Sequence, residues 1–248
     1  MSIGTDSVMV SGKSTSCRRN TALRKQVEGQ VPKINRGWIT GRPRSRGWNH
    51  SYTKRYIDSI IAALCLIALS PILAIIAIAV KLTCHGPVFF LQERTGYMGR
   101  RFKMFKFRTM IQDADKMKHH FTHLNLHRGN TPDFKIHRDP RITPIGHFLR
   151  KYSLDELPQL INVVKGDMRL VGPRPTSFNI NTYSEHHLGR LASPPGITGK
   201  WQISGRSNVD FDLRVKLDCE YHEEQGPIQD LKILIKTPLS IVRGEGAY

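Results

Sequence analysis

The sequence has few cysteines and few acidic residues, and both shortages restrict what it can be. Its four cysteines, at 17, 65, 84 and 219, have neither paired nor metal-binding spacing. A disulfide scaffold is therefore excluded, and we expect reduced thiols in a cytosol-facing protein. Only 20 Asp and Glu oppose 38 Lys and Arg, which gives a formal net charge of +18. This excess indicates an anionic partner, either membrane lipid, nucleotide or nucleic acid.

The first 50 residues have few large apolar side chains and contain no apolar stretch of the kind found in secretory signal peptides. They are rich in Ser, Gly, Arg and Asn, so we expect a disordered basic arm over residues 1–50. Attraction to anionic lipid is worth about 1 kcal/mol per basic residue near the surface. We do not expect nucleic-acid binding, because aromatic residues beyond Trp38 and Trp48 are missing from the arm and no reader domain follows.

One long apolar run follows the arm. Ile60–Val80 contains no charged residue, and as a straight helix it would be about 31 Å long, enough to span a hydrocarbon core of ~30 Å. Ser70 and Pro71 interrupt the run at its middle. Pro71 frees the carbonyl of Ile67 and bends the helix, while the Ser70 hydroxyl can bond back to the preceding turn.

Both flanks of this run are basic. Lys54 and Arg55 precede it, and a set of Lys and Arg residues opposed only by Glu93 follows it within residues 81–108. The positive-inside rule favours cytoplasmic placement of both flanks. We therefore predict a re-entrant helix-break-helix over residues 51–82, with its break at Ser70-Pro71. A bitopic anchor that crosses the membrane once is the alternative.

The remaining residues, 83–248, are expected to form a cytoplasmic domain of α+β class, mainly helical. Val88–Gln92 and Phe102–Phe107 read as strands joined through a Gly-containing connection. Lys103, Lys106 and Arg108 can then face lipid head groups or nucleotide phosphate. Near the C-terminus we expect helices over Asp210–Glu223 and Ile228–Val242. The apolar face of the second, formed by Leu231, Ile235 and Leu239, suits either core packing or the membrane interface.

The segment 138–175 has the strongest chemical signal. It contains adjacent carboxylates, Asp155 and Glu156, with arginines before them and a rigid Pro-Arg-Pro loop after them. An apolar face at 157, 160, 161 and 164 predicts a short helix that ends at Gly166. Ser153 and Glu156 fit a capping box, or Asp155 is itself the N-cap. Carboxylates at a helix start beside fixed guanidinium groups suit chemistry on a diphosphate.

A second cluster lies in the polar stretch Asp113–Lys135. His119, His123 and His127 would share one face of a helix, with His120 beside them. Metal binding is one interpretation, but no cysteine or closing carboxylate is evident. An exposed connection is the interpretation we favour.

Several long motifs resemble the monotopic polyprenyl-phosphate phosphoglycosyl transferases, the bacterial sugar transferases that initiate polysaccharide assembly. The matching stretches are DPRIT through LVGPRP at Asp139–Pro175, GPVFFLQERTGYMGRRFKMFKFRTM at Gly86–Met110, PPGITGKWQISGRS at Pro194–Ser207 and DLKILIKT at Asp230–Thr237. They occur in the order of the family and cover roughly residues 52–243, so they are far more specific than one short motif.

The resemblance implies transfer of a sugar 1-phosphate from a UDP-sugar to polyprenyl (undecaprenyl) phosphate through a covalent intermediate on Asp155. It also implies a re-entrant helix and a place on the cytoplasmic face of the bacterial inner membrane. Arg150 and Arg174, matched to the family motifs, are expected to bind phosphate together with Arg108. Two reacting anions repel each other, so we expect Mg²⁺, with Glu156 as the favoured ligand and Asp155 as the nucleophile and a second candidate ligand.

Two other functions remain open at this point. A membrane-anchored adaptor with a basic surface would share the anchor and the charge but would not need Asp155. A lipid-linked glycosyltransferase would release UDP instead of UMP. The sequence leaves open which sugar is transferred and whether the chain forms a homodimer.

Overall fold

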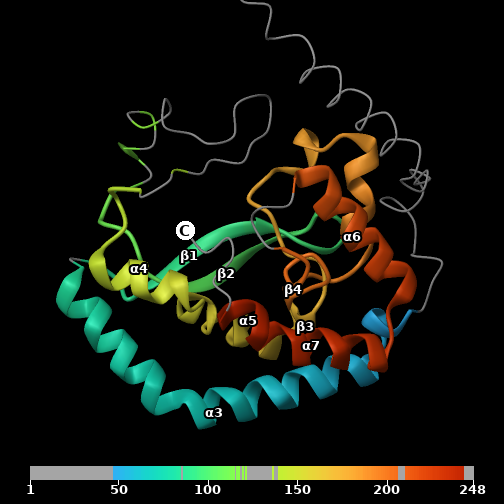
Figure 1. Ribbon diagram of the computed structural model, residues 1–248, viewed down its shortest axis with the longest axis horizontal. Helices are drawn as coiled ribbons and strands as arrows, with labels where there is room; N and C mark the ends of the chain where they lie inside the picture. Colours follow the sequence, from blue (N-terminus) through green and yellow to red (C-terminus); the bar gives the residue numbers. More distant parts are fainter. Residues whose placement is uncertain are drawn as a thin grey trace, which may run out of the picture.

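Helices form most of the described chain, with two small sheets between them (Figure 1). The computed structural model describes residues 47–84, 86–114, 116–117, 119, 121, 136, 139–205 and 210–242. Residues 1–46 of the predicted arm, and His120, His123 and His127 of the predicted histidine cluster, lie outside the described residues. The mainly helical class is confirmed.

The elements in chain order, with η for a 3-10 helix, are η1 (Trp48–His50), α3 (Tyr52–Thr83), β1 (Phe89–Thr95), η2 (Tyr97–Gly99), β2 (Arg101–Phe107), α4 (Pro144–Lys151), η4 (Leu154–Glu156), α5 (Gln159–Lys165), β3 (Arg169–Val171), η5 (Ile180–Thr182), η6 (Glu185–Ala192), β4 (Gly196–Thr198), α6 (Phe211–Glu224) and α7 (Pro227–Val242).

The apolar run lies within α3. Over the described ranges, this is the one helix that is long and apolar enough to cross a membrane. The Ser70 hydroxyl donates to the Ile67 carbonyl at 2.8 Å, which is the carbonyl that Pro71 deprives of its backbone donor. Figure 1 shows that α3 bends near the middle of its length, yet it stays helical from Tyr52 to Thr83. The interruption predicted at Ser70-Pro71 is therefore a bend in a continuous helix.

Both arms of α3, the first before Pro71 and the second after it, pack on the rest of the chain. Ala62 of the first arm lies in a core cluster with Leu160 and Val171, and Ile76 and Val80 of the second arm lie in a cluster with Phe107 and Leu149. Figure 1 shows both arms along the same side of the other elements. Only 11% of the apolar window is buried, so most of its apolar surface faces outward.

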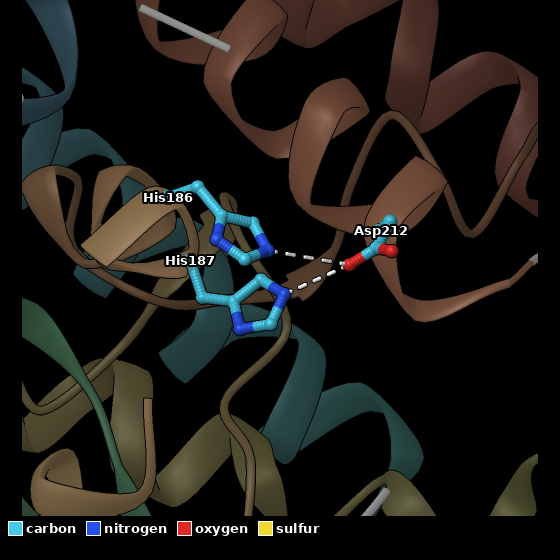
Figure 2. A group of neighbouring side chains, drawn as sticks. All are labelled: His186, His187 and Asp212. Atoms are coloured by element: carbon cyan, nitrogen blue, oxygen red, sulfur yellow. Dashed lines mark hydrogen bonds and ion pairs between the residues drawn. The ribbon is translucent and has the colours of Figure 1, made fainter. Parts of the chain in front are cut away.

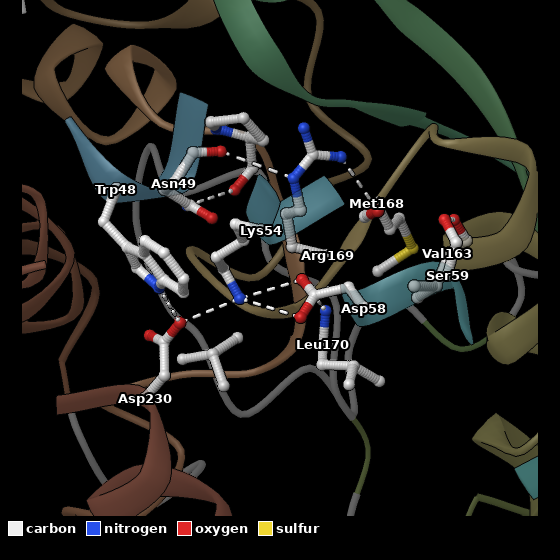
Figure 3. A network of polar contacts seen from close by, with 12 residues as sticks. Trp48, Asn49, Lys54, Asp58, Ser59, Val163, Met168, Arg169, Leu170 and Asp230 are labelled. Carbon is white, nitrogen blue, oxygen red and sulfur yellow. Dashed lines mark hydrogen bonds and ion pairs between the residues drawn. The ribbon is translucent and has the colours of Figure 1, made fainter. Parts of the chain in front are cut away.

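A buried charge network fixes the start of the first arm (Figure 3). Lys54 is 2% exposed, and its Nζ lies 2.8 Å from both Asp58 and Asp230. Asp58 also accepts a hydrogen bond from the Leu170 backbone N–H at 3.1 Å, and Asp230 accepts one from the Trp48 indole at 2.8 Å. Leaving one such charge unpaired costs about 3–5 kcal/mol, so the network joins α3 firmly to β3 and α7.

The two sheets are of different kinds. β1 and β2 pair antiparallel, with Phe89 opposite Phe107 and Thr95 opposite Arg101, as the sequence predicted. β3 and β4 form a short parallel pair that the sequence did not predict. Their contact depends on glycine, because a Cβ on Gly196 would lie 2.1 Å from the backbone nitrogen of Gly172. This close approach places the Pro-Arg-Pro loop, which follows β3.

The C-terminal helices match the predicted ranges, but α7 does not bury its predicted apolar face. Leu231, Ile235 and Leu239 are 58%, 63% and 59% exposed, whereas Ile233 is 1% exposed. Core packing of that face is therefore excluded. Asp230 links α7 to Lys54 of the first arm, so the exposed apolar face belongs to a helix that contacts the apolar helix α3.

Candidate active site

The carboxylate pair lies in η4, between α4 and α5. The chain leaves α4 at Tyr152, and Ser153 then takes a left-handed backbone conformation with φ 55°. The Ser153 side chain makes no cap hydrogen bond, so the predicted capping box is wrong. Asp155 is not the N-cap either, because α5 starts at Gln159 with Pro158 as its N-cap. Proline has no N–H and a fixed φ suited to a helix start, so the helix begins there and the acids occupy a separate turn.

The late start of α5 also changes its buried face. Its buried residues are Gln159, Leu160, Asn162 and Val163, and Val164, predicted to be buried, is 43% exposed. Gly166 ends the helix with φ 85°, as predicted. The side chain of Asn162 accepts from the Phe105 N–H at 2.9 Å and donates to the Lys103 carbonyl at 2.8 Å. These bonds fix β2 against α5.

Glu156 is held between two cations. Lys106 Nζ lies 2.8 Å from Glu156 Oε1, and Arg174 Nη1 donates to Oε2 at 2.8 Å while its Nη2 bonds Oε1. The Glu156 side chain is 17% exposed. Burial alone would raise the pKa of this carboxyl, but Arg174 and Lys106 outweigh it and hold the pKa well below its usual value. Glu156 is thus ionised and tightly paired.

Asp155 has a different environment from its neighbour. It is 7% exposed, and among the described residues no group donates a hydrogen bond to its carboxylate. Burial raises the pKa of Asp155; Lys106, Arg150 and Arg174 oppose that rise, and Glu156 adds to it. No α-helix begins at Asp155, so a helix dipole does not favour its charged form. Cations thus lie around a carboxylate to which none of the described residues donates a hydrogen bond.

Arg174 is positioned through its backbone. The Gly196 N–H donates to the Pro173 carbonyl at 2.9 Å, and Arg190 Nη2 donates to the Arg174 carbonyl at 2.9 Å. Arg190 is itself paired with Asp218 at 2.8 Å, with both side chains almost fully buried. The guanidinium of Arg174 therefore projects from a loop whose main chain is bound on both sides.

The structure brings together four of the predicted site residues and leaves one aside. Asp155, Glu156 and Arg174 adjoin one another, and Arg150 lies near enough to lower the pKa of Asp155. Arg150 Nε donates to the Thr109 hydroxyl at 2.9 Å. Arg108 instead donates from Nε to the Pro87 carbonyl at 2.8 Å, which ties this end of its guanidinium to the chain before β1.

Sequence reasoning missed two members of the site. Lys106 was expected only on a basic strand face toward lipid or phosphate; that it pairs with Glu156, 50 residues later, has no local signal. Arg190 supports the Arg174 carbonyl from η6, and nothing in its neighbourhood of the sequence indicates this. Both depend on which segments pack together.

A carboxylate pair among cations, close to a long apolar helix, is the arrangement expected of a membrane-associated enzyme that acts on phosphate. Comparison with known proteins agrees. The family model for bacterial sugar transferases matches residues 49–244, and the chain therefore belongs to the bacterial sugar transferase family.

Three relatives illustrate the match. The chain is 40% identical to exopolysaccharide production protein ExoY of Sinorhizobium fredii, over 79% of this chain and 88% of that protein. It is 41% identical to undecaprenyl-phosphate galactose phosphotransferase of Salmonella typhimurium and 40% identical to UDP-glucose:undecaprenyl-phosphate glucose-1-phosphate transferase of Escherichia coli, over 79% of this chain in both cases. It spans 42% and 41% of those two proteins, so it corresponds to less than half of their length.

Proposed function

We propose that this enzyme transfers a sugar 1-phosphate from a UDP-sugar to polyprenyl phosphate, at the cytoplasmic face of the bacterial inner membrane, as the first step of polysaccharide assembly. The names of two relatives, the galactose phosphotransferase and the glucose-1-phosphate transferase, describe this kind of reaction. The observation that carries the proposal is the contrast within the acid pair: Glu156 is engaged by Lys106 and Arg174, while Asp155 has cations around it and no hydrogen bond from a described residue.

That contrast supports a two-step reaction. A carboxylate oxygen of Asp155 attacks the sugar-bearing β-phosphorus, the bond from that phosphorus to the bridging oxygen breaks, and UMP leaves with the bond electrons. An oxygen of polyprenyl phosphate then attacks the same phosphorus, and the Asp155 carboxylate is the leaving group. The product is a polyprenyl diphosphate sugar, and Asp155 is regenerated. Two steps replace one hard displacement between anions.

The cations around the acid pair, Lys106 and Arg174, are expected to bind the phosphate oxygens of the substrate. Guanidinium groups bind phosphate oxygens in pairs of parallel hydrogen bonds, and Arg174 already presents that fork to Glu156. A diphosphate entering the site would compete with Glu156 for Arg174 and Lys106. In the free protein Glu156 thus holds both cations in place for the substrate, so they need little reorganisation when it binds.

Mg²⁺ is part of the proposal, and the donor set fits it. A carboxylate offers about four acceptor positions, of which Lys106 and Arg174 use three on Glu156. Asp155 supplies further oxygen close by, and Mg²⁺ binds one or two carboxylates together with substrate phosphates. When bound there, Mg²⁺ would neutralise charge on the diphosphate.

A re-entrant placement of α3 is the matching topology. Both arms of α3 dock on the same side of the remaining elements, and the helix bends near the middle of its length, with Ser70 and Pro71 in its interior. The helix α7, which has an exposed apolar face, contacts the first arm through the ion pair of Asp230 with Lys54. If α3 crossed the membrane as a straight helix, its two arms could not both pack on the remaining elements. The arrangement supports a segment that enters one leaflet and returns.

The released nucleotide tests this function. The full chain, in vesicles containing polyprenyl phosphate, would be offered a panel of UDP-sugars that includes UDP-galactose and UDP-glucose. We expect UMP, formed together with lipid-linked product. Release of UDP would indicate a lipid-linked glycosyltransferase instead. No turnover with any sugar of the panel would contradict an enzymatic function and favour a membrane-anchored adaptor.

Removal of divalent metal gives a second test. We expect turnover to stop with EDTA and to return with added Mg²⁺, because two anions must be brought together at the dyad. Metal content would be verified before the assay. Full turnover in a metal-free sample would refute the Mg²⁺ requirement and leave the transfer reaction itself standing.

A further inference from the structure

A second cluster of ligand-type side chains lies outside the acid pair, where η6 meets α6. His186 and His187 come from the start of η6, and Asp212 comes from the first turn of α6. Figure 2 shows both imidazole rings turned toward the same carboxylate. His187 Nε2 lies 2.8 Å from Asp212 Oδ1, and His186 Nε2 lies 3.7 Å from that oxygen. The three ligand atoms are all within 4.8 Å of one another.

Hydrogen bonding explains only part of this geometry. His187 makes a good hydrogen bond to Asp212, but the 3.7 Å from His186 is too long for one. Consecutive residues of a 3-10 helix project about 120° apart, yet the two rings converge, with centroids 3.8 Å apart. A cation held between the three ligand atoms would account for this convergence.

The donor set selects the kind of cation. Zn²⁺ binds imidazole nitrogen and carboxylate oxygen at about 2.1 Å in tetrahedral geometry, which places neighbouring ligand atoms about 3.4 Å apart. The observed 2.8 and 3.7 Å bracket that spacing. The three side chains are between 15% and 27% exposed, so an ion can enter.

We propose that His186, His187 and Asp212 bind one Zn²⁺ or a similar transition-metal ion that joins η6 to α6, with a fourth position open to water. Mg²⁺ would not compete, because it prefers oxygen ligands. The proposed metal site lies near Arg190, whose guanidinium donates a hydrogen bond to the Arg174 carbonyl in the Pro-Arg-Pro loop. The Phe211 ring contacts His187, with centroids 4.9 Å apart, and the Arg190 guanidinium lies over that ring at 5.3 Å. The ion would thus stiffen the segment from which Arg190 holds the Arg174 carbonyl.

Zinc binding by the full chain tests the proposal without an activity assay. The protein would be purified without a histidine tag, stripped with chelator, and titrated with Zn²⁺ in excess Mg²⁺. We expect retained zinc in elemental analysis, and a thermal midpoint raised by about 5 °C or more at a hundredfold excess over the dissociation constant.

Matched variants locate the ion. His187→Ala and Asp212→Asn should each lose one equivalent of zinc and the rise in midpoint. His147→Ala, at an exposed histidine of α4, should keep both, and His123→Ala removes the central member of the other histidine cluster in the sequence. If His123→Ala lost the equivalent of zinc and Asp212→Asn bound zinc as the unmodified chain does, the assignment of the ion to His186, His187 and Asp212 would be overturned.

Cobalt absorption on the unmodified chain keeps the proposal falsifiable if a variant fails to fold. Bound Co²⁺ should give visible bands typical of nitrogen and oxygen ligands, without the charge-transfer band of a thiolate. A stripped wild-type chain that takes up neither Zn²⁺ nor Co²⁺ would show that Asp212 and His187 form an ordinary hydrogen-bonded pair.

Discussion

Asp155 and Glu156 are adjacent in sequence and have opposite pKa shifts. Burial acts on both, but Glu156 receives direct ion pairs from Lys106 and Arg174, whereas Asp155 has only their longer-range influence. The same two cations thus hold the pKa of Glu156 well below its usual value and partly offset the effect of burial on the pKa of Asp155. Perturbed carboxylates of this kind are typical of functional sites.

Removal of Lys106 should move the acid limb of the pH profile. Asp155 must be ionised to attack, and its raised pKa means that activity falls as the pH drops through a value above the ordinary range of aspartate. Lys106 is the largest influence that lowers this pKa, so in Lys106→Met the limb should shift to higher pH. The measurement is kcat/KM against pH. Lys103→Met, at an exposed lysine of the same strand, is the control, and an equal shift there would contradict the assignment.

Arg174→Lys should cost activity although the charge is retained. Lysine cannot form the two-pronged contact that Arg174 makes with Glu156 and that we expect with phosphate. Loss of one charge-assisted hydrogen bond corresponds to a fall on the order of ten- to a hundredfold in kcat/KM. Arg100→Lys, at an exposed arginine between β1 and β2, should change little. Near-native kinetics of Arg174→Lys would show that this residue is peripheral to the reaction.

At the scale of elements, the sequence predicted those with strong local signals. The Ser70 hydroxyl bonds the Ile67 carbonyl as expected, since proline chemistry is local. The first two strands were predicted from alternation and a Gly-containing turn. β3 and β4 were missed, because strands of three residues carry no period and their pairing depends on the close approach of Gly172 and Gly196.

The start of α5 shows a second limit. The residue types around Ser153 match a capping box, but the Ser153 side chain makes no cap hydrogen bond. The α-helix begins later in the sequence, with Pro158 as its N-cap. The buried face then moved to include Gln159, Asn162 and Val163. In the candidate site, the sequence indicated the acids and Arg174, but the Lys106 and Arg190 contacts are set by tertiary packing.

Pro71→Leu tests the bend of α3. Leucine restores the backbone donor to the Ile67 carbonyl and should straighten the helix, which would move the N-terminus across the membrane in part of the population. The measurement is labelling of a single cysteine at Ser14, in a background without native cysteines, by an impermeant reagent on intact cells. With Pro71 in place, Ser14→Cys should stay unlabelled. Labelling there would instead favour the bitopic anchor.

At the scale of the whole molecule, the parts that concern the membrane lie together. Both arms of α3 and the exposed apolar face of α7 adjoin one body, and the Lys54 network joins them. In the proposed function, polyprenyl phosphate presents its reactive group at the membrane surface and the nucleotide sugar is cytosolic, so the site would work at that boundary. The body held by α3 contains the acid pair, so the anchor and the chemistry belong to one unit.

The covalent intermediate on Asp155 is the central claim, and intact-mass analysis tests it most directly. The full chain would be mixed with a UDP-sugar in the absence of polyprenyl phosphate, quenched, and digested to map any adduct. The account predicts added mass of one sugar phosphate on Asp155, an equal amount of UMP, and neither in Asp155→Asn. An adduct mapped to another residue, or lipid-linked product formed by Asp155→Asn, would contradict it.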